Sequence, residues 1–274
     1  MLGLVVEIQQ PLSPDLSHSW DWAGTYPNQS DALPAHVSGT TGTYVTLLCA
    51  RDDMSSYSIR LYEESDHRTV QEIFISGCHE HIPTAFYRGL RRPHSWLLLL
   101  GALALPLLAA GSVLLSILAV IGVLLILWLP GREFYLYHIR HGLAGDLKDI
   151  RKHYLQREYH CFWVVDQEGE VIGMVAAIPS ITPHEKNIEL KRMFVADHHR
   201  GKGIAKVLCR TVIDFARRSG CNAVVLSTTN VQVHAVTMYE KVGFKQTAPA
   251  VYNPWLGLVG MAWVSYRYDI SSHT

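Results

Sequence analysis

The sequence predicts an α/β fold that is interrupted by a hydrophobic membrane segment. Two observations carry this prediction: strand and helix patterns that follow each other after residue 160, and one uncharged run, 96–129, in the middle of the chain. The 274 residues allow one domain plus the insertion. The charges balance, with 24 basic and 24 acidic residues, so composition gives no electrostatic argument for nucleic-acid binding.

A glycine-rich turn joins a predicted strand to a predicted helix. Residues 188–195 alternate as in a half-buried strand, and apolar residues recur at three and four positions over 204–215, as on one helix face. Between them, Arg200–Ala205 places glycines and backbone amides at the positive end of the helix dipole. This arrangement suits a pyrophosphate, and Arg200 and Lys202 add positive charge. The glycines alone, however, are explained equally well by a tight turn that binds no ligand.

The pattern Arg-x-x-Gly-x-Ala after a strand resembles the acetyl-CoA loop of the GNAT acyltransferase superfamily. A Walker loop is excluded because no Gly-Lys-Ser/Thr follows, and a dinucleotide fingerprint because the third glycine is missing. The strand 223–228 and the pattern Ala235-x-x-x-Tyr239-x-x-x-Gly243-Phe244 resemble the rest of that fold. The resemblance covers about residues 161–246 and implies a mixed central sheet flanked by helices.

Residues 57–246 are more narrowly similar to the camello-like N-acetyltransferase family, in which a membrane segment interrupts a GNAT fold near its start. The local matches are Ile59-Arg60-x-Tyr62-x-Glu64-Ser65-Asp66, Pro83-x-Ala85-Phe86, Cys161–Val164 and Arg200–Ala205. The resemblance implies an enzyme of the endoplasmic reticulum or a related endomembrane that acetylates an amine: a cysteine S-conjugate, an amino acid such as aspartate, or a protein lysine. The alternative is a catalytically weak CoA-binding membrane protein that affects secretory trafficking or cell adhesion.

Four segments follow from these patterns. Residues 1–54 lack periodicity and are rich in Pro, Ser, Thr, Gly and Asn, which predicts a disordered extension; Met54 is an alternative start. Residues 57–92 resemble the first strand and helices of the GNAT domain, with Ser65 or Asp66 as the helix cap. Residues 96–129 form the membrane segment, and 131–270 complete the domain.

The membrane segment has two possible topologies. If the first strand pairs with those after residue 160, the chain must leave and re-enter on one side of the bilayer, and arginines flank the run on both sides, as expected for cytosolic flanks. Pro106 and Gly111-Ser112 then divide the run into the arms of a re-entrant hairpin, each too short to span alone. The rival is a single crossing from about Leu107 to Leu129. The hairpin is favoured, with a cytosolic catalytic domain.

The rest of the domain is predicted from shorter patterns. An amphipathic stretch, 134–154, is expected along the membrane surface or the sheet. A hairpin of 161–165 and 170–178 turns at Asp166-Gln167-Glu168-Gly169, and 261–268 forms a closing strand. The apolar segment 254–260 is expected to touch lipid or to line the acceptor pocket.

The resemblance places a strand carboxylate as general base and a helix tyrosine as acid. Glu189 stands where GNAT enzymes with a glutamate base carry it, on one predicted strand face with Lys191, Met193 and Val195. The other interpretation is a solvated strand residue that pairs with Lys191 or Arg192. Tyr239 matches the family tyrosine that protonates the leaving thiolate, and a packing role is the other interpretation. His234 is a weaker base candidate.

Acetyl-CoA is the expected co-substrate, and no metal is expected. The cofactor contacts implied by the resemblance are the backbone amides of the loop and of Val195, with Asn230 as a pantetheine contact. The loop residues are Arg200, Gly201, Lys202, Gly203, Ile204 and Ala205. Cys78-His79-Glu80-His81 has no second pair of ligands at the spacing of a zinc site, and the five scattered cysteines argue against a disulfide framework.

Overall fold

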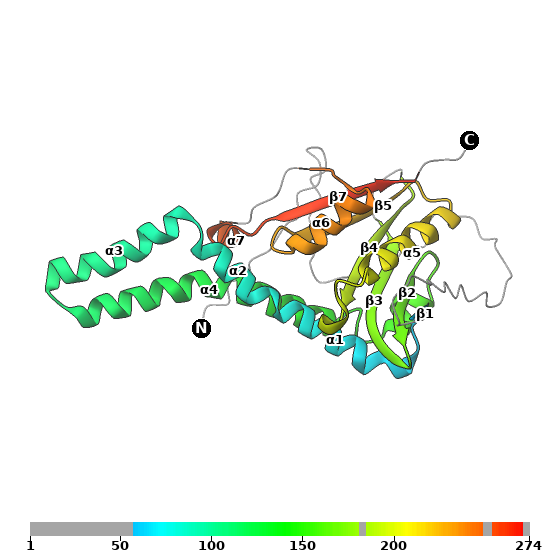
Figure 1. Ribbon diagram of the computed structural model, residues 1–274, viewed down its shortest axis with the longest axis horizontal. Helices are drawn as coiled ribbons and strands as arrows, with labels where there is room; N and C mark the ends of the chain where they lie inside the picture. The colour runs from blue at the N-terminus through cyan, green and yellow to red at the C-terminus, as the bar shows by residue number, and fades with distance from the viewer. Residues whose placement is uncertain (1–56, 181–184, 249–253, 271–274) are drawn as a thin grey trace. The chain divides into compact units, whose positions relative to one another are not determined.

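The computed structural model describes residues 57–180, 185–248 and 254–270, and the predicted extension 1–54 lies outside them. A seven-stranded sheet in the order β1-β2-β3-β4-β5-β7-β6 organises the fold (Figure 1). Its strands are β1 Ser58–Leu61, β2 Cys161–Gln167, β3 Glu170–Pro179, β4 Asn187–Val195, β5 Ala223–Thr229, β6 Lys245–Gln246 and β7 Trp263–Asp269. Neighbouring strands are antiparallel except β4 and β5, which are parallel. The predicted mixed sheet is confirmed.

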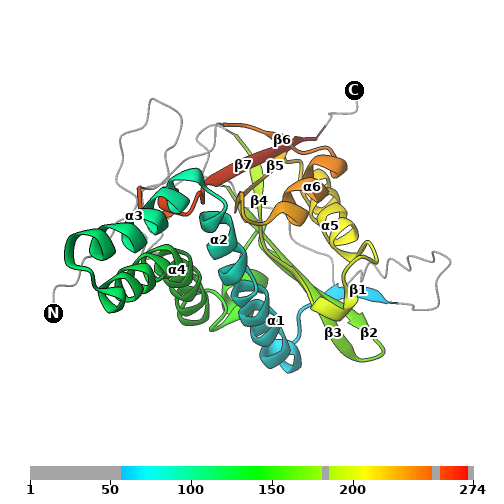
Figure 2. The ribbon, with the colours of Figure 1, turned by 60° about the vertical axis from the view of Figure 1, so that its left-hand side comes forward.

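Helices cover both faces of this sheet (Figure 2). The elements are η1 Glu64–Asp66, α1 His67–His79, α2 His81–Leu90, α3 Pro93–Ala110, α4 Val113–Ala144, η2 Arg151–Leu155, η3 Asp197–His199, α5 Ile204–Arg218, α6 Val233–Val242 and α7 Pro254–Leu258. On one face, which we call the α5 face, Leu208 and Tyr239 join the buried cluster. On the opposite α4 face, α1 and the end of α4 contribute Phe74 and Ile139. Burial on both sides explains the continuous apolar run of β3.

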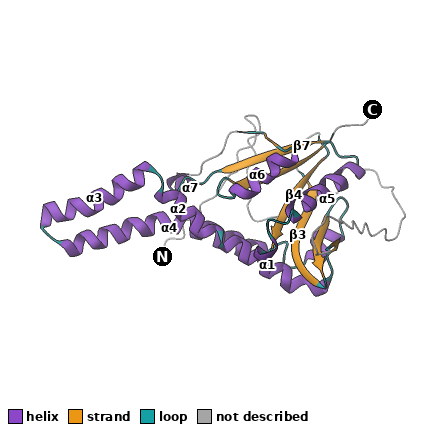
Figure 3. Ribbon diagram, in the orientation of Figure 1, coloured by secondary structure: helices purple, strands orange, loops and turns teal. Residues whose placement is uncertain are grey.

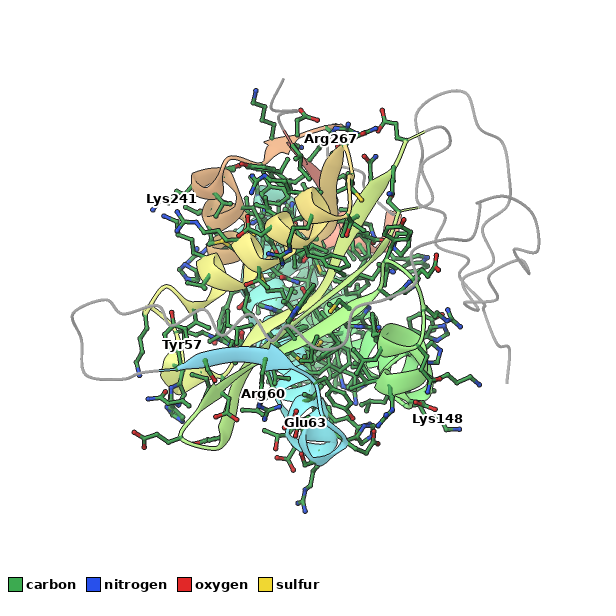
Figure 4. All side chains as sticks on the ribbon, turned by 90° about the vertical axis from the view of Figure 1, so that its right-hand side faces the viewer. Tyr57, Arg60, Glu63, Lys148, Lys241 and Arg267 are labelled. Atoms are coloured by element: carbon green, nitrogen blue, oxygen red, sulfur yellow. The ribbon has the colours of Figure 1, made fainter. Side chains whose placement is uncertain are left out.

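Strand β1 belongs to the same sheet as the strands that follow the apolar run. Ile59 pairs with Val165 and Leu61 with Trp163, so the first strand does pair with a strand after residue 160, the condition on which the predicted hairpin rests. Arg60, labelled on β1 in Figure 4, stabilises this edge of the sheet. Its guanidinium donates to Asp66 at 2.7 Å and to Asp166 at 2.9 Å. Asp66 occupies the predicted cap position of α1, but its carboxylate binds Arg60 and the Glu63 amide rather than an amide of α1.

The hairpin between β2 and β3 turns more tightly than the sequence predicts. Strand β2 continues to Gln167, so only Glu168 and Gly169 remain in the turn. Both have positive φ, 54° and 87°. A two-residue turn with two positive φ angles matches the right-handed twist of its strands, and glycine adopts such angles without strain.

The apolar run forms two antiparallel helices, α3 and α4, which lie side by side (Figure 3). They join at Gly111, with φ of 61°, and Ser112, whose hydroxyl accepts from the Leu115 amide. The helix α3 runs through Pro106, so only Gly111-Ser112 breaks the run. Both helices extend beyond the apolar run and are long and apolar enough to cross a membrane, so the expectation of arms too short to span is wrong.

The predicted amphipathic stretch 134–154 is not one separate element. Its first part continues α4 to Ala144, and η2 follows at Arg151–Leu155. Ile139, Ile150 and Tyr154 are buried in the α4-face cluster, so this stretch packs on the sheet, which was one of its two expected positions.

Candidate active site

Strands β4 and β5 separate after a short stretch of pairing. Asn187 to Glu189 pair with Ala223 to Val225; past these residues β4 continues beside β3, and β5 beside β7. A bulge at Arg192, with φ of 51°, adds to the divergence, because Lys191 pairs with Ala176 while Phe194 pairs with Met174. We call the unpaired region between the two strands the β4/β5 gap. It exposes backbone groups of parallel strands in the middle of the sheet.

Glu189 stands at the start of the β4/β5 gap, on the α4 face. Its chain neighbours Ile188 and Leu190 point to the α5 face, where they are buried. Its carboxylate lies 3.7 Å from the Lys191 ammonium, and the two side chains are 28% and 38% exposed. The prediction that Glu189 shares a strand face with Met193 and Val195 is wrong. The bulge inserts one residue into β4, and this turns the side chains of Met193 and Val195 onto the α5 face.

The glycine loop stands at the start of α5, as predicted. Gly201 and Gly203 have φ of 78° and 81°, and Gly203 caps the helix. Among the residues that the structure describes, a Cβ placed on either glycine would meet no atom within 4 Å, so they leave the surface over the loop open. The first amides of a helix have no partner within the helix and carry the positive end of its dipole, which is the donor set that a phosphate needs.

The Arg200 side chain braces the loop. Its Nε donates to the Val195 carbonyl at 3.0 Å, and its Nη1 donates to the Glu80 carboxylate at 2.7 Å. Asp197 lies 3.4 Å from the same nitrogen. These contacts tie the loop to the end of β4 and to the end of α1, and the two carboxylates offset the charge that was expected to attract phosphate. Lys202 remains exposed.

The backbone amide of Val195 points toward the β4/β5 gap. Val195 pairs with Gly173, and the following amide, that of Ala196, donates to the Ile172 carbonyl at 2.8 Å. This is the pattern around a non-hydrogen-bonded antiparallel pair, whose own N–H and C=O point away from the partner strand. The amide therefore has the orientation that the predicted cofactor contact needs.

Tyr239 lies on α6 and is buried on the α5 face. Its ring packs edge-on against Phe244, with centroids 5.7 Å apart, and near Tyr266 at 6.4 Å. Burial, with a smaller contribution from Cys209 on α5, raises the pKa of its phenol above the ordinary value. The phenol therefore keeps its proton at neutral pH. Tyr239 and Glu189 belong to opposite faces of the sheet. His234 is exposed on α6.

Asn230 follows β5 and holds the segment that leads into β7. Its Nδ2 donates to the Gly260 carbonyl at 3.2 Å, and its Oδ1 accepts from the Ala262 amide at 3.0 Å. The side chain is thus engaged within the protein, and the predicted pantetheine contact has to compete with these bonds or use a backbone group.

One turn of α4 connects the two edges of the β4/β5 gap on the α4 face. Tyr135 bonds through its hydroxyl to Thr229 at the end of β5, at 3.2 Å, and Phe134 packs edge-on against Trp263 of β7. On the other edge, His138 accepts from Arg192 in the bulge at 3.4 Å. Helix α4, which carries the second part of the apolar run, therefore also forms a wall of the candidate site. This wall was not predicted from the sequence, where the helical spacing of Phe134, Tyr135 and His138 is its signal.

Arg192 and Asp146 form a largely buried ion pair behind this wall. Arg192 donates to both carboxylate oxygens, at 2.9 and 2.6 Å, and Tyr154 donates to one of them. The two side chains are only 15% and 23% exposed. Burial acts to raise the pKa of Asp146, but Arg192 and Tyr154 outweigh it and hold the pKa below its ordinary value.

We expect Asp146→Asn to lower the free energy of unfolding by about 3 kcal/mol at pH 7, because the Arg192 guanidinium would stay inside without its carboxylate. A carboxyl with a depressed pKa stabilises fully above its unfolded pKa of about 4, and this stabilisation is lost as the pH falls through the folded-state pKa. The difference from wild type should therefore shrink below about pH 4 in denaturant unfolding followed in detergent.

The matched control is Asp214→Asn, which removes the carboxylate of an ion pair with Arg217 whose side chains are 43% and 44% exposed. This change should cost less than about 1 kcal/mol, because water screens exposed pairs. Equal losses in the two variants would contradict the role given to the Arg192–Asp146 pair.

The Cys78–His81 segment is built into the fold. Cys78 is buried, which raises its pKa to about 12; Glu80 binds Arg200; and His81 packs against Tyr135 with ring centroids 5.5 Å apart. Within the described ranges, no three His, Cys, Asp or Glu side chains gather as metal ligands would.

Comparisons with known proteins identify the family. Residues 127–244 match the model of the acetyltransferase (GNAT) family. Human N-acetyltransferase 8B is 38% identical over 221 residues, which are 80% of this chain and 97% of that protein. Mouse N-acetyltransferase 8F1 is also 38% identical over 221 residues, covering 80% of this chain and all of the mouse protein. A GNAT-family acetyltransferase structure from Staphylococcus aureus shares 15% identity, with a TM-score of 0.46, over 78% of this chain and 99% of its own.

The match defines an acetyltransferase of the GNAT class. Within this class, the chain belongs to the N-acetyltransferase 8 family, and the predicted resemblance to camello-like N-acetyltransferases is confirmed.

Proposed function

We propose that this protein is a membrane-bound enzyme that transfers the acetyl group of acetyl-CoA to an amine acceptor. The observation that carries the proposal is the open glycine loop at the start of α5, directly after a strand that has separated from its parallel neighbour. A loop of amides suits the pyrophosphate, and the gap-facing amide of Val195 suits the amide-rich arm of the cofactor. Acetyl-CoA supplies an activated acetyl thioester.

Glu189 and Tyr239 are suited to opposite ends of the transfer. The amine must lose a proton before it attacks, and the departing thiolate must gain one. Glu189 is a partly exposed carboxylate on the α4 face, so it can accept a proton directly or through water. Tyr239 is a buried, protonated phenol on the α5 face and can donate one. A thioester held in the β4/β5 gap would lie between the two faces.

The acceptor is proposed to be a cysteine S-conjugate, an amino acid or a protein lysine, as the resemblance implies. Purified protein in detergent should release CoA from acetyl-CoA in the presence of one of these amines. The assay compares cysteine S-conjugates, aspartate and lysine peptides at equal concentration. Acetyl-CoA binding without turnover on any acceptor would overturn the enzymatic proposal and favour a CoA-binding protein.

We further propose that α3 and α4 enter a membrane of the endoplasmic reticulum or a related compartment as a hairpin, with the catalytic domain in the cytosol. The pairing of β1 with β2 supports the hairpin, because a single crossing would place these strands on opposite sides of the bilayer. The eighteen residues of α3 measure about 27 Å, close to the hydrocarbon thickness of about 30 Å. Leucines over the hairpin are exposed, Leu108 by 83%.

Tags placed before Tyr57 and after Thr274 are expected to show the same protease accessibility in sealed microsomes, since the hairpin returns the chain to its starting side. Detergent-permeabilised microsomes give the full-cleavage reference. Opposite accessibility of the two tags would exclude the hairpin and establish a single crossing.

A further inference from the structure

Exposed aromatic side chains gather on the elements at the base of the α3–α4 hairpin. They come from four elements and include Trp96 in the first turn of α3 and Trp255 in α7, each 60% exposed. The other two are Tyr87 of α2, 61% exposed, and Trp128 of α4, 37% exposed. Tryptophan and tyrosine are enriched where a protein passes from the bilayer core to the headgroups, because their rings are apolar and carry one polar atom.

The short helix α7 is fixed to this base by specific contacts. Leu256 and Val259 are buried, and Val259 packs against the α2 residue Gly89. The ring of His94, at the start of α3, bonds to the Leu258 carbonyl at 3.1 Å. Figure 1 shows α7 beside the start of α3 and near α4. With Leu256 of the helix and Val259 just after it turned inward, α7 presents Trp255 outward.

The charges around this base fit a membrane surface. From His81 to Arg132 the chain carries no acidic residue, and arginines 91 and 92 precede the apolar run. Arg88 is engaged within the protein, where it donates to the Gly260 and Asn230 carbonyls, and Arg132 after the run pairs with Glu133. Arg91 is exposed, and the Arg132 guanidinium lies 5.1 Å from the centre of the Trp128 ring. The segment from Trp255 to Gly260 carries no charged residue. Basic and aromatic side chains around an apolar stem complement anionic headgroups above a hydrocarbon core.

From these observations we infer that α7 is a second membrane contact, which lies at the headgroup level with Trp255 inserted and holds the catalytic domain against the bilayer. This inference rests on the proposed membrane insertion of the hairpin and deepens it. The surface is continuous with the lipid-facing hairpin through His94 and Trp96. The sequence left two expectations for 254–260, contact with lipid or lining of the acceptor pocket. The inferred contact of α7 corresponds to the first of these.

The contact determines how far the candidate site lies from the bilayer. From Leu129, the last residue of the apolar run, to Phe134 in the site wall is about 8 Å along α4. From α7, the chain passes through Gly260–Ala262 to Trp263, which packs against Phe134. The α4-face wall of the β4/β5 gap is therefore connected to the membrane surface by two short rigid paths.

Photocrosslinking of the full-length protein in nanodiscs tests this contact. A benzophenone amino acid replaces Trp255, Leu114 near the hairpin turn, or Val233 on α6, one position at a time, in bilayers of phosphatidylcholine and phosphatidylserine. Leu114 and Val233 are 67% and 53% exposed, so the three probes are comparably accessible. We expect lipid adducts at 255 and 114 and none at 233, with the adduct at 255 nearer the headgroup.

The outcomes separate this inference from the proposed hairpin. Lipid adducts at 114 but none at 255 would overturn the α7 contact and leave the hairpin intact. Lipid adducts at 255 but none at 114 would support the α7 contact and contradict insertion of the hairpin. A protein–protein adduct at 255 in place of the lipid adduct would overturn the α7 contact, because it would show that a second copy of the chain, and not the bilayer, covers this surface.

Discussion

Gly203→Val should weaken acetyl-CoA binding about 10- to 100-fold in calorimetry while the protein still folds. Gly203 has φ of 81° at the first turn of α5, a conformation in which a β-branched residue is strained by about 1–3 kcal/mol. Relaxing this strain rotates the loop amides, and each 1.4 kcal/mol lost from binding is a factor of ten. A Cβ at this position meets no atom of the described part of the chain within 4 Å, so the change crowds the ligand side of the loop and leaves the core packing unchanged.

The matched control is Gly169→Val in the turn between β2 and β3. Gly169 has φ of 87° and equally open surroundings, so valine brings the same backbone strain at a site remote in sequence from the loop. This variant should lose a comparable amount of stability and keep its affinity for acetyl-CoA. Unchanged affinity in Gly203→Val, or an equal loss in the two variants, would contradict the assignment of Arg200–Ala205 as the cofactor loop.

Local patterns predicted every strand of the sheet except the two-residue β6, and its main helices, because each has a strong short-range signal. The α5 helix begins after Gly203 and ends with basic residues before Gly220, whose φ is 62°. The α6 helix ends at Gly243, where positive φ lets the Phe244 amide return to the Tyr239 carbonyl. Such caps are encoded by single residues, so a sequence alone reveals them.

The features of the fold and the site that could not be predicted from the sequence depend on contacts between residues far apart in the chain. The bulge at Arg192 follows from a buried pairing with Asp146, 46 residues away in the chain, which no alternation of apolar residues encodes. The continuation of α4 past Pro130 into the site wall also depends on a contact between distant residues, because the Tyr135 hydroxyl bonds to Thr229, 94 residues away in the chain. Both features changed the predicted site: the first moved Met193 and Val195 to the other face, and the second added His138.

We expect Glu189→Gln to lower turnover by about 10²–10⁴-fold with little change in acetyl-CoA affinity, because a general base contributes to the rate by this factor. The amide nearly preserves the shape of the side chain but cannot take a proton, so the acidic limb of the pH profile of kcat/KM should disappear as well. Lys191→Met is the control: it breaks the 3.7 Å pair and keeps the carboxylate. A rate loss in Lys191→Met equal to that of Glu189→Gln would assign the effect to the ion pair.

Tyr239→Phe should also lower turnover while acetyl-CoA affinity and stability stay close to wild type. The phenol is buried against Phe244 and Tyr266, so phenylalanine keeps the packing and removes only the proton donor. Tyr266→Phe, in the same cluster, removes a hydroxyl that donates to Glu240 and should leave the rate nearly unchanged. Loss of solubility together with affinity in Tyr239→Phe would show that the residue is structural.

Wild-type rates in both Glu189→Gln and Tyr239→Phe on a verified acceptor would overturn the assignment of these two residues as the catalytic pair. His138, beside Arg192 in the site wall, would then be tested ahead of the exposed His234.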